Sequence, residues 1–86
     1  MEEELHHYLD RISEDPRVMV GKPVVKGTRV TVERVLAHLA ETPDLDDLFA
    51  AFPHLVIEDV QACLAYAYQT VVSERDQRVG RQPTRV

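Results

Sequence analysis

Apolar residues recur along this chain at spacings that divide it into short predicted elements. The first group has helical spacing and consists of Leu5, Tyr8, Leu9 and Ile12. It predicts a short amphipathic helix over residues 2–11. Asp15-Pro16 interrupts that helix, because the residue before a proline avoids the helical region. Val18 and Val20 alternate with other residues and predict a strand after it.

Three further helices are predicted in the second half of the chain. Thr31 is a suitable N-cap for a helix over 32–41, and Asp44 is a suitable N-cap for a second helix that ends near Phe52. The third helix is predicted over 57–75. Two short helices followed by a longer one predict a mainly α fold. Its three-helix core would be helix-turn-helix-like, of the homeodomain or winged-helix kind.

A β-hairpin is predicted before these helices. Val24-Val25 and the segment 30–32 are rich in β-branched residues, and residues 26–29 connect them. Gly27 in this connection permits backbone angles that other residues resist. The predicted loop would present Lys26 and Arg29 beside exposed backbone amides.

Several short motifs follow one another in a specific order. They are Ile12, Asp15-Pro16, Gly21-Lys22-Pro23, Gly27-Thr28-Arg29, Phe52-Pro53 and Glu58-Asp59. With this pattern the chain resembles the domain-of-unknown-function 433 family over about residues 12–68. The resemblance implies a small helix-turn-helix-like domain behind a hairpin. Some members of that family are VapB-type antitoxins paired with PIN-like ribonuclease toxins, while many have no established activity.

Two residues depart from the family pattern. Thr42 stands where a glycine usually ends the first core helix, and Val56 stands where a Ser or Thr N-cap usually precedes the acidic pair. Loss of that cap costs about 1 kcal/mol unless another group replaces it. Neither change is expected to alter the fold.

Length and composition indicate one soluble domain. The chain has 86 residues, of which 44% are hydrophobic and 29% charged, and it contains neither a long apolar run nor a signal-like N-terminus. We therefore expect a cytoplasmic protein without membrane association. A single domain is predicted over residues 1–75, with a basic C-terminal tail over 76–86. The lone Cys63 lies in an apolar helical stretch and is expected to be a buried small hydrophobe.

Charge is segregated along the chain, although the net charge is −5. Residues 17–40 carry five bases and one acid, whereas residues 41–60 carry six acids and no base. The predicted nucleic-acid-binding residues are Lys22, Lys26, Arg29 and Arg34. They would contact phosphates, since the third core helix has no Lys or Arg before Arg75 with which to read bases. Two alternatives remain open: a solvated patch, or a structural role for Arg29.

The third core helix carries more apolar residues than one face can hold. Ile57, Val60, Leu64, Ala67 and Val71 have the spacing of a core-facing stripe. The remaining residues predict a homodimer interface formed by Tyr66, Tyr68 and Val72. The alternative is that both tyrosines fold back on the N-terminal helix.

Arginines dominate the C-terminal end, and the resemblance suggests a use for them. Residues predicted to bind the toxin are Arg78, Arg81 and Arg85. PIN-like ribonucleases hold a divalent metal with a cluster of acidic residues, so arginines inserted among those carboxylates would displace the metal. The alternative is an ordinary basic tail.

Enzymatic function is not expected. The four histidines are scattered, no spacing resembles a metal site, and no cofactor is predicted. Together with the family resemblance, these features predict an antitoxin-like protein that neutralises a PIN-like ribonuclease. It would also bind promoter DNA and repress its own operon. The alternatives are a free-standing DNA-binding regulator and a structural protein–protein interaction module.

Overall fold

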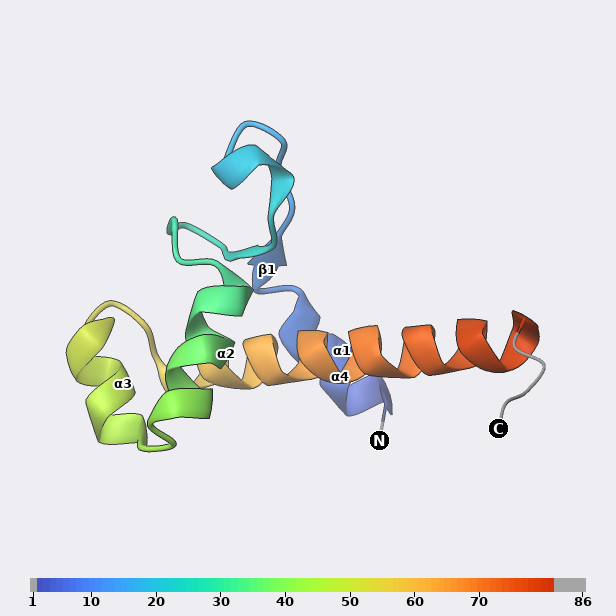
Figure 1. Cartoon of the computed structure of the whole chain (residues 1–86). Helices are drawn as coiled ribbons and strands as arrows, with labels where there is room; N and C mark the ends of the chain where they lie inside the picture. The colour runs from blue at the N-terminus through green and yellow to red at the C-terminus, as the bar shows by residue number, and fades with distance from the viewer. Residues whose placement is uncertain (1, 82–86) are drawn as a thin grey trace.

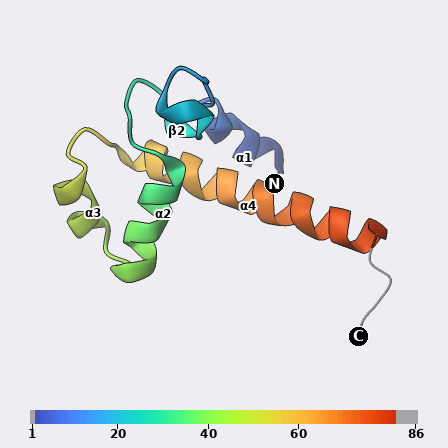
Figure 2. The same ribbon diagram turned by 45° about the horizontal axis from the view of Figure 1, so that its top comes forward.

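The computed structural model describes the backbone of residues 2–81 and the side chains of residues 5–75. The elements are α1 (Glu2–Leu9), β1 (Ile12–Ser13), a 3-10 turn η1 (Met19–Gly21), β2 (Val24–Val25), α2 (Val32–Glu41), α3 (Leu45–Ala51) and α4 (Ile57–Arg81). α4 is the longest element, α1 crosses it, and α2 and α3 lie at its N-terminal end (Figures 1 and 2). The predicted mainly α fold with a three-helix core and a preceding β-hairpin is confirmed.

The hairpin has a different strand partner from the one predicted. β2 pairs antiparallel with β1, with Ile12 opposite Val25 and Ser13 opposite Val24. The predicted pairing with the segment 30–32 is present as a bridge between Val24 and Thr31, supported by a 3.0 Å hydrogen bond from the amide of Val25 to the carbonyl of Val30. β2 therefore lies between two short antiparallel neighbours.

The strand predicted around Val18 and Val20 is wrong. Met19 and Val20 have φ of 51° and 57°, in the left-handed region, and η1 closes with hydrogen bonds from Gly21 to Val18 and from Lys22 to Met19. Val20 is 92% exposed, so no buried face exists to hold this segment in a sheet. Alternation of valines alone does not make a strand without a surface to pack on.

The predicted N-caps of α2 and α3 are confirmed. Thr31 Oγ1 accepts a hydrogen bond from the amide of Arg34, and Asp44 Oδ1 accepts from the amides of Asp46 and Asp47. Each side chain satisfies amides that have no partner inside the first helical turn. These local contacts start both helices at the predicted residues.

Asp59 replaces the missing N-cap of α4. Its Oδ2 accepts a 3.0 Å hydrogen bond from the amide of Val56, which is the reciprocal half of a capping box. Its Oδ1 accepts from Arg11 Nη1 at 3.0 Å, and Asp59 is only 8% exposed. The same carboxylate thus caps α4 and ties it to the segment after α1.

The core lies where β2, α2, α3 and the first half of α4 meet. It consists of Val25, Val32, Val35, Leu48, Phe52, Leu55, Val60 and Cys63. On α4 the buried positions include Val60, Cys63 and Ala65, because α2 packs on one side of the helix and α1 on the adjoining side. The stripe predicted to face the core is wrong at three positions. Ile57, Leu64 and Val71 are exposed.

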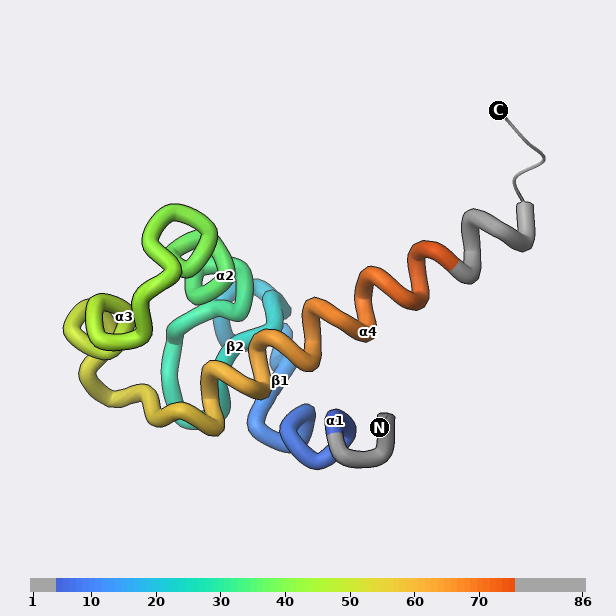
Figure 3. The backbone as a smooth tube through the Cα atoms, turned by 90° about the horizontal axis from the view of Figure 1, so that it is seen from below, coloured from blue at the N-terminus to red at the C-terminus, as the bar shows by residue number. Residues whose placement is uncertain are grey.

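α4 is also longer than predicted. It continues to Arg81 instead of ending near Arg75, although Gly80 lies in its last turn. Figure 3 shows the helix leaving the body of the domain beyond its contact with α1. No helix in the described part of the chain is both long and apolar enough to cross a membrane.

Candidate interaction surfaces

The Gly-Thr motif builds a rigid loop at the hairpin. Thr28 Oγ1 donates to the carbonyl of Val25 at 2.8 Å and accepts from the amide of Val30 at 3.0 Å. Gly27 has φ of 80°, a conformation that favours glycine, and a Cβ there would meet no atom within 4 Å. Because both ends of the loop are held, the neighbouring Lys26 and Arg29 extend from a fixed base.

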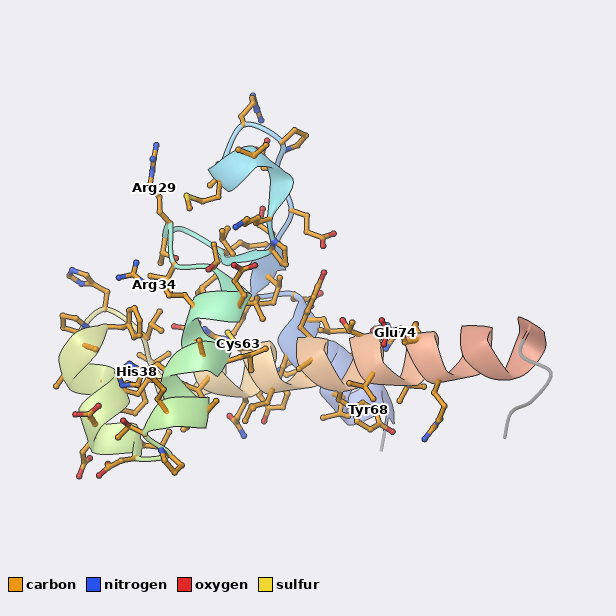
Figure 4. All side chains as sticks on the ribbon, viewed as in Figure 1. Arg29, Arg34, His38, Cys63, Tyr68 and Glu74 are labelled. Atoms are coloured by element: carbon orange, nitrogen blue, oxygen red, sulfur yellow. The ribbon has the colours of Figure 1, made fainter. Side chains whose placement is uncertain are left out.

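The four predicted nucleic-acid-binding residues do not form one patch. Lys22 Nζ lies 3.3 Å from Glu33 Oε2, so an acid partly neutralises it. Lys26 and Arg29 line a groove on the side of the loop that faces Asp15. Arg29 also lines a second groove together with Arg34, and these two arginines lie on the same side of the hairpin and α2 (Figure 4).

Arg29, Arg34 and His54 line a groove of about 410 Å³ between the hairpin loop and the α3–α4 connection. No acidic residue is among its described lining residues. We call it the cationic groove. The sequence analysis did not predict His54 as a site residue. The feature that could have indicated it is its position directly after Phe52-Pro53. Two guanidinium groups with open access can bind a phosphate or a carboxylate in a bidentate manner.

An aromatic contact holds Arg34 in the cationic groove. Its guanidinium lies 5.3 Å from the centroid of the Phe52 ring, in cation–π geometry. His38 packs edge-on against the same ring, and its Nε2 lies 2.8 Å from Asp47 Oδ2. This cluster orients Arg34 from beneath, so the arginine is pre-positioned for a ligand.

A second surface runs along α4. Ile57, Leu64, Tyr68 and Val71 are 42%, 49%, 41% and 62% exposed, and we call these four residues the α4 stripe. An adjoining groove of about 330 Å³ between α1 and α4 is lined by Leu5, Tyr8, Gln61, Leu64, Ala65 and Tyr68. The stripe and this α1–α4 groove form a continuous apolar surface, since they share Leu64 and Tyr68.

The predicted dimer residues lie on different sides of α4. The Tyr66 hydroxyl donates to Glu14 Oε2, and this bond to a carboxylate raises the pKa of Tyr66. Tyr66 therefore binds the segment after β1, and not the N-terminal helix named in the alternative interpretation. Tyr68 belongs to the α4 stripe and lines the α1–α4 groove, and Val72 is half-buried. Figure 4 shows Tyr68 on the opposite side of α4 from Glu74.

The predicted toxin-binding arginines fall at the end of the chain. Arg78 and Arg81 belong to the last turns of α4, where the structure describes the backbone. Arg85 lies outside the described residues. The extension of α4 means that Arg78 and Arg81 are one helical turn apart, not in an irregular tail.

Two further observations concern the thiol of Cys63 and the metal-ligating side chains. Cys63 is fully buried, and desolvation, helped by the nearby charge of Asp59, raises the pKa of its thiol to about 12. A thiol in that state is a poor nucleophile. Among the described residues, no three His, Cys, Asp or Glu side chains gather closely enough to hold a metal ion.

The fold and surfaces define a small α-helical domain with a short β-hairpin, a cationic groove and an exposed apolar helix face. The chain belongs to the family described as "Protein of unknown function (DUF433)", whose model matches residues 12–67. That match covers the hairpin, the three-helix core and the first half of α4. Neither the curated proteins nor the solved structures contain a significant match to the chain.

Proposed function

We propose that this protein is an antitoxin-like binding protein that neutralises a PIN-like ribonuclease. The observation that carries the proposal is the projection of α4 beyond the body of the domain (Figures 1 and 3). Such a helix can reach into a partner while the three-helix core stays outside. Its last turns include Arg78 and Arg81, and Arg85 follows in the sequence.

The chemistry of inhibition follows from charge. A ribonuclease of this kind holds its divalent metal with clustered carboxylates, and a guanidinium forms short, bidentate bonds with the same oxygens. An arginine inserted there neutralises the cluster and removes the positions that the metal needs. Hydrolysis then stops without any catalytic group on this protein, which is consistent with its buried, protonated Cys63.

The test is RNA cleavage by a PIN-like ribonuclease encoded beside this protein, with the protein added at equal concentration. The full chain should block cleavage, whereas a chain truncated after Arg75 should lose most of the inhibition. The combined R78Q, R81Q and R85Q variant should behave like the truncation. R17Q serves as the matched control, because Arg17 is exposed and lies in the loop before β2. Unchanged inhibition by the truncated chain would refute tail insertion.

The cationic groove favours a second candidate function, the DNA-binding regulator. Arg29 and Arg34 both line it, without an acid among the described lining residues. Binding through phosphates predicts a DNA affinity that falls steeply between about 50 and 200 mM salt. R29Q and R34Q should lower the affinity for DNA. K22Q should lower this affinity less, because Glu33 already pairs with Lys22. A flat salt response would exclude this function.

A further inference from the structure

We propose that the α4 stripe is the contact surface of a homodimer in which two α4 helices pack antiparallel. Together with Gln61 and Arg75, the four residues of the stripe form a row with alternating steps of four and three residues: Ile57, Gln61, Leu64, Tyr68, Val71 and Arg75. This seven-residue repeat is the seam by which two α-helices pack over a long distance. From Ile57 to Arg75 the seam extends for about 27 Å at the helical rise of 1.5 Å per residue.

The rest of the described chain covers the seam only in part. α1 and α2 cover adjoining sides of α4, where Val60, Cys63 and Ala65 are buried. α1 borders Leu64 along one edge of the seam, yet Leu64 is 49% and Val71 62% exposed. Four large apolar side chains on one face, joined to the apolar α1–α4 groove, exceed the isolated exposed residues normal for a monomer. A partner helix can place a side chain in that groove and so widen the contact beyond a two-helix seam.

The order of charges along α4 selects a second copy as the partner. The helix begins with the exposed Glu58 beside the seam, and its last exposed seam position is Arg75. An antiparallel partner brings Glu58 of one helix near Arg75 of the other, whereas a parallel partner places Glu58 beside Glu58 and Arg75 beside Arg75. The opposed helix dipoles favour the antiparallel arrangement as well.

A two-fold axis near position 66 gives a self-complementary register. Leu64 then lies opposite the partner's Tyr68, and Gln61 lies opposite the partner's Val71. Ile57 then lies opposite the partner's Arg75, whose long side chain can reach the neighbouring Glu58 at both ends of the interface. Each contact occurs twice, as an isologous interface requires. Tyr68 supplies the aromatic group typical of interface centres.

The first measurement is the mass of the full chain by sedimentation equilibrium at micromolar concentrations. The expected result is a dimer of twice the 9.8 kDa chain mass. L64E should raise the dimer dissociation constant about a hundredfold or more, because two unpaired carboxylates enter the seam. Leu64 is half-exposed, so circular dichroism should show an unchanged fold. V20E is the matched control, since Val20 is 92% exposed but lies far from α4 in the hairpin region, and it should remain dimeric.

A charge exchange tests the register. E58R and R75E should each weaken the dimer about fivefold, and the double variant should restore it, as two pairs are re-formed with reversed sign. Glu58 and Arg75 are 17 positions apart on one straight helix, so only contact between copies can produce that rescue. A monomeric full chain, a dimeric L64E variant, or a double variant without rescue would each overturn the proposed interface. The measurement uses this chain alone, so its outcome is independent of ribonuclease inhibition.

Discussion

Replacing Asp59 with alanine removes the carboxylate that joins two parts of the fold. Asp59 accepts from the amide of Val56 at the start of α4 and from Arg11, 48 positions earlier in the chain. The Asp59 side chain is 11% exposed, so water reaches its carboxylate only in part in the native state. The substitution therefore affects both the cap of α4 and the attachment of the N-terminal segment.

The magnitude can be worked from these two bonds. The bond to the Val56 amide is one half of a capping box, and its loss costs about 1 kcal/mol. Val56 is 47% exposed, so water can reach this amide once the carboxylate is gone, and the larger penalty of a buried unpaired amide does not apply. The Arg11 side chain is 45% exposed and regains water, so its lost bond adds about 1 kcal/mol or less. We expect the free energy of unfolding to fall by about 1–2 kcal/mol.

Urea denaturation followed by circular dichroism measures this change. R11A provides the matched comparison, because it removes the ion pair but leaves the cap, and it should cost about 1 kcal/mol or less. D59N keeps an oxygen that can accept from the Val56 amide. Its free energy of unfolding should therefore lie between those of R11A and D59A. The reasoning is refuted if D59A destabilises no more than R11A, because the cap would then contribute nothing.

Four further predictions concern single residues. G27A should destabilise the protein by about 1–2 kcal/mol, because φ of 80° is costly with a Cβ, and an unchanged urea midpoint would contradict this. V20N should stabilise it by up to about 1 kcal/mol, since asparagine tolerates the left-handed region that Val20 occupies; a destabilised variant would contradict it. Cys63 should resist thiol-specific labelling at pH 8 in the native protein and react on unfolding, and rapid native labelling would show that it is not buried. The raised pKa of Tyr66 means that its stabilising bond to Glu14 is fully present below the unfolded tyrosine pKa of 10.0 and is lost as pH rises through the higher folded pKa. Urea midpoints of the native protein should therefore decline above pH 10 more than those of Y66F, and identical pH profiles would contradict this.

Local sequence signals predicted much of the helical structure correctly. Thr31 and Asp44 cap helices within three residues of themselves, so their effect needs no distant partner. The bounds of α2 were predicted to the residue, and those of α3 to within one. The end of α4 was predicted too early, because the helix continues through Gly80 although glycine is unfavourable in a helix interior.

The candidate surfaces were only partly predictable. Arg29 and Arg34 were predicted together, but His54 enters the cationic groove from a loop about twenty residues later. Lys22 was assigned to the same patch, and its pairing with Glu33 appears only when α2 is placed beside the hairpin. Tyr66 and Tyr68 were both predicted to be interface residues, and only the structure shows that Tyr66 binds Glu14 within the chain.

The sequence by itself determined where helices begin, because capping and hydrophobic periodicity act over a few neighbouring residues. Only the tertiary structure decided which face of α4 is buried. Apolar residues occur around most of that helix. Periodicity alone therefore could not show whether the buried face is the one with Val60 and Cys63 or the one with Leu64 and Val71. The choice was made by the positions of α1 and α2, which pack on adjoining sides of α4. The pairing of Asp59 with Arg11 and of β1 with β2 likewise depends on segments that meet only when the chain folds.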